Sequence, residues 1–263
     1  MQVLRPGELQ VMSAGTGVTH SEMNASREEP VHRAGTRGYA DHGWLKTHHT
    51  FSFAGYYDPE RIHFGALRVL NDDTVAPGEG FGTHPHDNME IVSLVLSGAL
   101  KHGDSMGNMQ VLRPGELQVM SAGTGITHSE MNASREEPVK FLQIWVITDA
   151  EGHTPRYNPL ELAPAKRNQF RLIGAPEGCG GENVGWIHQT AWFHTLDLDA
   201  GREAGYRMNL HGNGAYVFVI EGSAEVAGEK LGPRDGMGIA DADEFLIRAS
   251  EDAKLLVIEV PII

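Results

Sequence analysis

Cysteine is nearly absent from this sequence, and long apolar runs are missing. The single cysteine among 263 residues, Cys179, has no partner for an intrachain disulfide, and its glycine-rich surroundings predict a surface thiol. No apolar stretch approaches the roughly 18 residues of a membrane-spanning helix, and no basic segment followed by an apolar one marks a secretion signal. These absences exclude a disulfide framework, and they predict a cytoplasmic protein with no membrane partner.

Basic residues are also scarce. The chain has 21 lysines and arginines against 35 aspartates and glutamates, which gives a formal net charge of −14 at pH 7. A field of this sign repels nucleic acid phosphates and anionic membrane surfaces. We therefore expect no direct binding of nucleic acid.

Glycine and proline, in contrast, are plentiful, with 32 and 13 residues. This composition is typical of many turns and short strands, so we expect an all-β protein. Turns are predicted at residues 71–73, 77–80 and 114–115. They separate short apolar stretches with strand character, and such a series indicates a sandwich or a barrel. The expected strands of the first half are residues 64–70, 91–96, 117–120 and 141–147.

A second series of strand-like stretches indicates a second barrel. Residues 151–168 carry three prolines and are predicted to connect a first domain, 32–150, to a second domain, 169–263. When the halves are aligned on Gly98 and Gly222, the positions of His84 and His86 correspond to Met208 and Leu210, so the second barrel lacks this histidine pair. The expected strands of this half are residues 192–198, 216–220, 224–226, 244–248 and 255–260.

Residues 1–31 repeat residues 109–139 with 30 identities in 31 positions. Two nearly identical pieces do not make a repeat protein, which needs several copies to build its core, so a recent duplication or an error in gene assembly is the better explanation. Only one copy can occupy a given place in a barrel, and the internal copy follows its preceding strand through a short turn. We therefore predict that residues 1–31 are a loosely attached appendage whose removal leaves metal binding intact.

Two pairs of side chains point to a metal site. One residue separates His84 from His86, and one separates His128 from Glu130, so in strands each pair projects to one face. On facing strands of a barrel the pairs can converge, supplying three imidazole nitrogens and one carboxylate oxygen. This leaves one or two coordination positions open, as a working metal centre requires. Ligands without sulfur suit iron, nickel, copper, manganese or zinc, and they do not choose among these metals.

Other residues compete for roles at this site. Glu90 lies four residues after His86 and, in a continuous strand, would share its face, so it is the alternative carboxylate ligand. His48 and His49 are predicted to point to opposite faces, so that one of them can line the pocket. His211 is interpreted as a turn residue. Candidates for an apolar lining are Phe53, Met89 and Met120.

Several stretches of the chain resemble known motifs. Residues 78–98, with His84, His86 and Glu90, and residues 115–132, with His128, look like the two cupin motifs. The match to the pirin family is closer and covers roughly residues 33–263. It is carried by Arg37–Leu45, His49–Phe53, Gly82–His86, Asp104–Asn108 and Met120–Glu130.

The resemblance implies a bicupin, that is, two cupin-type β-barrels of the double-stranded β-helix kind, with metal in the N-terminal barrel only. The family's ligands fall on His84, His86, His128 and Glu130, the set that strand alternation also selects. The first-motif glutamate is not the family's usual ligand, which argues against Glu90. The chain departs from the family in its extra N-terminal copy, which leaves open how the first strand pairs.

Bacterial pirin-like proteins are associated with quercetin 2,3-dioxygenase activity. The resemblance therefore implies an enzyme that cleaves a flavonol or a related enolic aromatic with dioxygen, releasing carbon monoxide. It implies one divalent metal, with Fe(II) first and Mn, Ni, Cu, Co or Zn as alternatives, and Glu130 as the acceptor of the substrate's hydroxyl proton. The alternative is a non-enzymatic, metal- and redox-responsive regulator that binds a partner protein, because the family also includes regulators.

Overall fold

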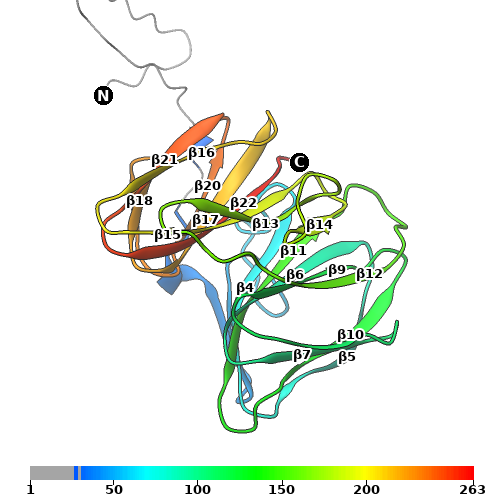
Figure 1. Ribbon diagram of the computed structural model, residues 1–263. Coiled ribbons are helices and arrows are strands. Elements are labelled where there is room, and N and C mark those ends of the chain that lie inside the picture. The colour runs from blue at the N-terminus through cyan, green and yellow to red at the C-terminus, as the bar shows by residue number, and fades with distance from the viewer. Residues whose placement is uncertain (1–26, 29–30) are drawn as a thin grey trace, which may run out of the picture.

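The computed structural model describes residues 27–28 and 31–263, and it consists almost entirely of strands arranged as two β-barrels (Figure 1). Each barrel combines a seven-stranded sheet with a four-stranded sheet. One short 3-10 helix, η1 (Ala34–Thr36), lies before the first barrel. No helix within the described residues is long and apolar enough to cross a membrane.

The first barrel contains the predicted metal ligands. Its larger sheet has the order β12-β9-β6-β11-β4-β3-β2 and its smaller sheet the order β5-β10-β7-β8, with antiparallel pairing throughout. The strands are β2 (Gly38–Asp41), β3 (Leu45–His49), β4 (Leu67–Val75), β5 (Gly80–His86), β6 (Met89–Ser97), β7 (Leu100–Asp104), β8 (Met109–Leu112), β9 (Glu116–Ser121), β10 (Ile126–Asn132), β11 (Val139–Ile147) and β12 (Arg156–Glu161).

The second barrel repeats this plan. Its sheets have the orders β1-β20-β17-β22-β15-β13-β14 and β16-β21-β18-β19. The strands are β1 (Arg27–Glu28), β13 (Phe170–Pro176), β14 (Gly185–Ile187), β15 (Trp192–Leu198), β16 (Glu203–Arg207), β17 (Asn213–Glu221), β18 (Ala224–Val226), β19 (Glu229–Leu231), β20 (Gly236–Ala240), β21 (Glu244–Ala249) and β22 (Ala253–Pro261).

The expected all-β bicupin architecture is confirmed, but the turn predicted at residues 71–73 is wrong. These residues lie inside β4, which pairs with β3 on one side and β11 on the other. Asn71 and Asp73 are buried, and the amide oxygen of Asn71 forms a 3.0 Å hydrogen bond with Nδ1 of His49. Backbone pairing on both sides of β4, together with the bond between Asn71 and His49, holds these turn-favouring residues in the strand.

The segment before the first barrel attaches to the second one. The predicted appendage lies mostly outside the described residues, but Arg27–Glu28 pairs with β20, and the backbone of His32 exchanges hydrogen bonds of 2.7 and 2.9 Å with Gly236. Residues 151–168, predicted as a connection, include β12, which pairs with β9 at the edge of the first barrel's larger sheet. The exact domain boundaries stay a prediction.

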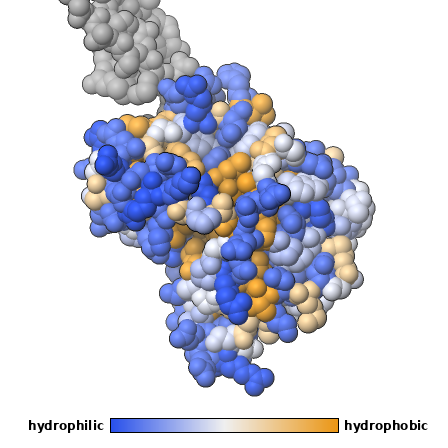
Figure 2. Space-filling model, in the orientation of Figure 1, coloured by the Kyte–Doolittle hydropathy of each residue, from blue (hydrophilic) through white to orange (hydrophobic). Residues whose placement is uncertain are grey.

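The apolar cores explain why a polar site belongs in the first barrel. A large buried cluster lies between the barrels, where β4, β6 and β11 contribute with β15, β17 and β22. On the surface, Figure 2 shows hydrophobic residues gathered along the middle of the face in view. A single apolar cluster fills the interior of the second barrel. Inside the first barrel the apolar residues form two separate clusters, one around Phe141 and one around Met120, and polar side chains occupy the space they leave.

Candidate metal centre

Strand pairing brings the two predicted ligand pairs together. In the smaller sheet of the first barrel, β10 pairs with β5 so that His128 lies opposite His84 and Ile126 lies opposite His86. Alternation along each strand then places His84, His86 and His128 on the same side of the sheet. The register of the β5–β10 pairing shifts between His128 and Glu130, so the pairing of these two strands is irregular next to the site.

The three imidazoles form one compact group. Ring centroids are 4.5 Å apart for His84 and His128, 4.8 Å for His84 and His86, and 4.9 Å for His86 and His128. Each ring offers one nitrogen, and these three nitrogens lie within 4.8 Å of one another. Among the described residues, this is the sole group of three or more potential metal ligands. The group lies in the N-terminal barrel, where the family resemblance predicts the metal.

Burial keeps His86 and His128 in the form that binds a metal. Burial, with the neighbouring His84 and His86, lowers the pKa of His128 to about 2, and burial with the charge of His84 lowers the pKa of His86 to about 4, with Asp87 opposing it. Neutral imidazoles have the lone pair that a cation needs. Nδ1 of His84 donates to the carbonyl of Gly82 at 2.8 Å, so its Nε2 is free for ligation.

Glu130 is placed differently from the three histidines. Its carboxylate is buried and does not belong to the compact group. Oε1 accepts hydrogen bonds from Ser93 Oγ at 2.9 Å and Gln118 Nε2 at 2.6 Å, and Oε2 accepts one from Gln143 Nε2 at 2.6 Å. Burial raises the pKa of Glu130, although these bonds and His102 oppose the shift. One lone pair of Oε2 has no donor among the described residues.

Glu90, the alternative carboxylate, is directed elsewhere. Asn88 has a φ of 44° between β5 and β6, which interrupts the strand, so counting alternate residues from His86 does not predict the direction of Glu90. The Glu90 carboxylate accepts a 2.7 Å hydrogen bond from Ser121, and burial raises its pKa.

Of the residues proposed as pocket lining, Phe53 lies near the histidine cluster, to which it is connected through Trp145. His48 and His49 face opposite sides as expected, and the buried His49 ring lies 5.3 Å from Phe53. Phe53 meets the edge of Trp145 at 5.2 Å, and Trp145 in turn meets His86 at 4.9 Å. Trp145 was not predicted from the sequence, although its place in an apolar strand two residues after Gln143 was a usable signal.

Met120 and Met89 belong to the apolar cluster that lies beside Trp145. His211 is exposed in the second barrel and pairs with Asp243 at 3.0 Å. Cys179 is exposed, as predicted.

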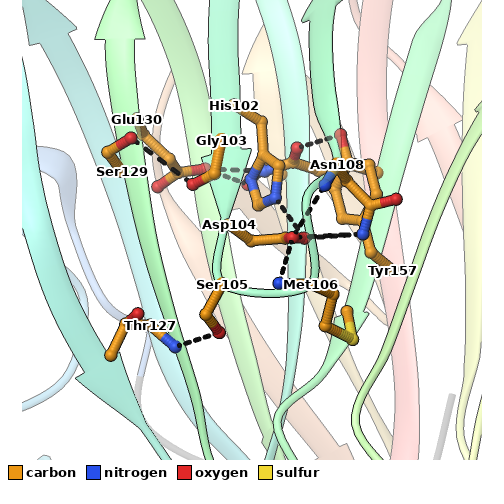
Figure 3. A network of polar contacts seen from close by, with 12 residues as sticks. His102, Gly103, Asp104, Ser105, Met106, Asn108, Thr127, Ser129, Glu130 and Tyr157 are labelled. Atoms are coloured by element: carbon orange, nitrogen blue, oxygen red, sulfur yellow. Dashed lines mark hydrogen bonds and ion pairs between the residues drawn. The ribbon is translucent and has the colours of Figure 1, made fainter.

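Sequence reasoning also missed His102 and Asp104 on β7. This strand flanks β10 on the side opposite β5, with Asp104 opposite His128 and His102 opposite Glu130. Figure 3 shows the side chains of His102 and Asp104 next to each other. The signal was a histidine and an aspartate with one residue between them, the same spacing as in the ligand pairs. Burial works to raise the pKa of Asp104, but hydrogen bonds from His102, Asn108 and Met106 lower it overall.

The buried donors fit a metal. Both ring nitrogens of His128 are buried and form no hydrogen bond with any described residue, which is costly for a polar side chain unless a ligand satisfies it. Three imidazoles brought together by two paired strands provide a site for one divalent metal with open positions. Fold and site together define a bicupin with a metal centre in one barrel.

Comparison with known proteins identifies the family. The Pirin family model matches residues 34–146, and it matches residues 1–36 separately, as a near copy of residues 109–139 should. The model of the quercetinase C-terminal cupin domain matches residues 172–260. The chain therefore belongs to the pirin family.

Individual relatives support this assignment. A quercetin 2,3-dioxygenase of Escherichia coli is 39% identical over 88% of this chain and 98% of its own length, and a pirin-like protein of Caulobacter vibrioides is 39% identical over 84% and 95%. The crystal structure of the E. coli pirin YhhW with nickel(II) has a TM-score of 0.83 and 38% identity, covering 89% of this chain and 99% of YhhW. A quercetin 2,3-dioxygenase structure from Acinetobacter baumannii, at 21% identity and a TM-score of 0.73, shares the fold.

Proposed function

We propose that this protein is a metal-dependent dioxygenase of the quercetin 2,3-dioxygenase type, which cleaves a flavonol or a related enolic aromatic with dioxygen. The observation that carries the proposal is the cluster of three histidines, of which His128 has two ring nitrogens without a partner among the described residues. The E. coli relative named as a quercetin 2,3-dioxygenase matches most of both chains, which supports the substrate class.

The proposed metal is Fe(II), with Mn, Ni, Cu, Co and Zn as alternatives, because imidazole and carboxylate ligands accept all of them. YhhW has been crystallised with nickel(II), which supports a divalent ion in this position. A divalent transition metal bound here would supply a Lewis acid for an enolic oxygen and, when redox-active, a path for electrons to dioxygen.

Glu130 is proposed as the fourth ligand and as the acceptor of the substrate's hydroxyl proton. Its position two residues after His128 supports a place on the same face. Its Oε1 is occupied by donors from Ser93 and Gln118, whereas Oε2 receives one donor, from Gln143, and can take either a metal or a proton. The three donors hold the carboxylate in one orientation, which general base catalysis requires.

Trp145 and Phe53 are proposed to bind the aromatic rings of the substrate beside His86. Their rings stand edge to face with each other, and Trp145 stands edge to face with His86. The indole nitrogen of Trp145 is buried and has no acceptor among the described residues, so it can donate to a substrate oxygen. Together these side chains would orient a flat ligand and exclude water from the metal.

The function is tested with anaerobically purified protein of known metal content. Quercetin and then oxygen are added, and carbon monoxide and the ring-opened ester are measured, with release of one carbon monoxide expected for each dioxygen consumed. Matched samples loaded with iron, manganese, nickel and copper identify the working metal. Absence of turnover with every metal at full loading contradicts the dioxygenase.

The alternative, a regulator acting through a partner protein, stays a prediction that no contact in the described residues favours. The cytoplasmic location also stays a prediction.

For the organisation of the chain we propose an N-terminal metal-binding domain over residues 32–150 and a C-terminal domain over residues 169–263. β12, within the segment between them, pairs with the first domain.

A further inference from the structure

Three buried ring nitrogens beside the metal centre lack a hydrogen-bond partner among the described residues. Two are Nδ1 and Nε2 of His128, and the third is Nδ1 of His102. An unpaired buried polar atom is costly, so each of these nitrogens calls for an explanation. A metal accounts for only one nitrogen of His128, which leaves the other and that of His102 open.

Asp104, the last residue of β7, determines which nitrogen of His102 carries a hydrogen. Nε2 of His102 lies 3.0 Å from Oδ2 of Asp104, and both side chains are fully buried. An ionised carboxylate accepts hydrogen bonds but does not donate them, so Nε2 carries the hydrogen. In the neutral ring Nδ1 is then a bare acceptor.

Both carboxylate oxygens of Asp104 already accept hydrogen bonds from other donors, so Asp104 does not accept one from His128, although the two residues lie opposite each other. Its Oδ1 accepts from the backbone nitrogens of Met106 and Asn108, at 2.9 and 3.0 Å, and from the side chain of Asn108 at 3.1 Å. Its Oδ2 accepts from His102 and also from the Asn108 side chain at 2.9 Å. Figure 3 shows Asp104 at the centre of these contacts.

The rings of His102 and His128 are close enough to pair. Their centroids are 5.4 Å apart, with an angle of 50° between the planes. A straight N–H···N bond of ordinary length places two imidazole centroids roughly 5 Å apart. Tyr157 stacks on His102 at 4.0 Å and 7°, which holds the plane of the ring and leaves its nitrogen-bearing edge free.

We infer that His102 supports the metal centre as a positioning residue. In the metal-loaded protein, the ring nitrogen of His128 that does not bind the metal donates its hydrogen to Nδ1 of His102, whose Nε2 donates to Asp104. This chain satisfies all three nitrogens at once. A metal-ligating histidine commonly donates its second N–H to an acceptor, which fixes the ring and makes it a stronger ligand. The inference rests on the proposed metal centre and not on the proposed reaction.

The experiment measures nickel(II) binding to the metal-free, full-length protein by calorimetry, so it gives a result whether or not quercetin is a substrate. His102→Leu removes the acceptor and is expected to weaken nickel binding by roughly 10–100-fold while one ion still binds per chain. His102→Asn can place its amide oxygen near the position of Nδ1, and it is expected to restore most of the affinity.

The control variant is His211→Leu. His211 also pairs with an aspartate, Asp243, but it is exposed in the second barrel, and its replacement is expected to leave nickel binding unchanged. Circular dichroism of each variant establishes that the fold is retained. If the His102→Leu variant does not fold, the inference is tested on the unmodified protein instead.

In that case long-range nitrogen–proton NMR of the unmodified protein, with and without zinc, decides the question. The expected signature is a bare Nδ1 on His102 whose resonance shifts on zinc loading as it accepts a hydrogen bond. A protonated Nδ1, or no shift on loading, overturns the inference. Three binding results also overturn it: unchanged affinity of His102→Leu, equal losses for the Leu and Asn variants, and complete loss of the ion, which would make His102 a ligand.

Discussion

The imidazole of His84 lies 4.5 Å from that of His128, ring centre to ring centre, across the pairing of β5 with β10. Neither strand has a site alone, because two ligands bind a metal weakly and the third comes from the other strand. The barrel therefore produces the metal centre by holding these two strands in register.

The first prediction concerns acid stability. The pKa of His86 and of His128 lies below the ordinary 6.5, at about 4 and about 2, chiefly because burial disfavours the charged rings. Below pH 6.5 the unfolded chain binds protons that the folded protein does not, so the free energy of unfolding of the metal-free protein falls as the pH decreases from 6.5 towards 4. Urea titrations at several pH values measure this slope.

His86→Asn is the matched variant for this test, because asparagine does not titrate. It is expected to reduce the slope between pH 6.5 and 4. An unchanged slope contradicts the assignment of a half-buried His86 with a lowered pKa.

The second prediction concerns Asp73 inside β4. Burial, with the charges of Glu130 and Asp72, raises its pKa to about 7. The unfolded chain loses this proton at lower pH than the folded protein, so Asp73 destabilises the fold increasingly as the pH rises from 4 to 7. Asp73→Asn is expected to stabilise the protein at pH 8 by on the order of 2 kcal/mol and to have little effect at pH 4.

Thermal denaturation of both proteins at the two pH values checks this expectation. Asp241→Asn, the same change at an exposed position of the second barrel, serves as the control. A stabilisation of the same size at pH 4 and pH 8 would show that Asp73 does not titrate in this way.

The third prediction separates the two proposed roles of Glu130. Glu130→Gln replaces the carboxylate with an amide, which does not accept the substrate's proton, and it leaves the three histidines in place. We expect quercetin turnover to fall by about 100-fold or more, while one nickel ion still binds with reduced affinity. Unchanged turnover at full metal loading argues against Glu130 as the base, and unchanged nickel affinity argues against it as a ligand.

The fourth prediction concerns Trp145. Trp145→Phe keeps an aromatic ring beside His86 and Phe53 but removes the indole N–H. Losing one hydrogen bond to the substrate is expected to raise KM by up to roughly tenfold and to leave kcat and metal content nearly unchanged. Steady-state kinetics with quercetin measures both constants. A fall in kcat with constant KM contradicts a role in substrate binding.

The fifth prediction concerns the N-terminal repeat. Removal of residues 1–31 is expected to leave metal content intact, because all three clustered histidines lie in the first barrel and its own copy of the repeat forms β8, β9 and β10. The melting temperature is expected to fall slightly, since the pairing of β1 with β20 is lost. Loss of the metal on truncation contradicts the assignment of the internal copy to the barrel.

Much of the site follows from the sequence because strand alternation is a local rule. It predicted that His84 and His86 share a face, and the series of short strands predicted barrels. The rule fails where the strand is interrupted, as at Asn88 before Glu90. It also cannot predict which strands become neighbours, so the place of His102 and Asp104 beside β10 was missed.

Non-local partners account for the other differences. Asn71 and Asp73 have turn propensity, but hydrogen bonding and pairing inside the barrel place them in β4. The apolar core between the barrels joins strands from both halves of the chain, a pairing of surfaces that no window of sequence reveals.

The most direct test of the metal centre is the metal content of the protein and of two histidine variants, purified without oxygen and measured by mass spectrometry. The unmodified protein and His20→Ala, which alters the N-terminal copy, are expected to retain about one divalent ion per chain. His128→Ala, which removes the ligand in β10, is expected to lose most of it. Equal metal content in the two variants would contradict the site described here.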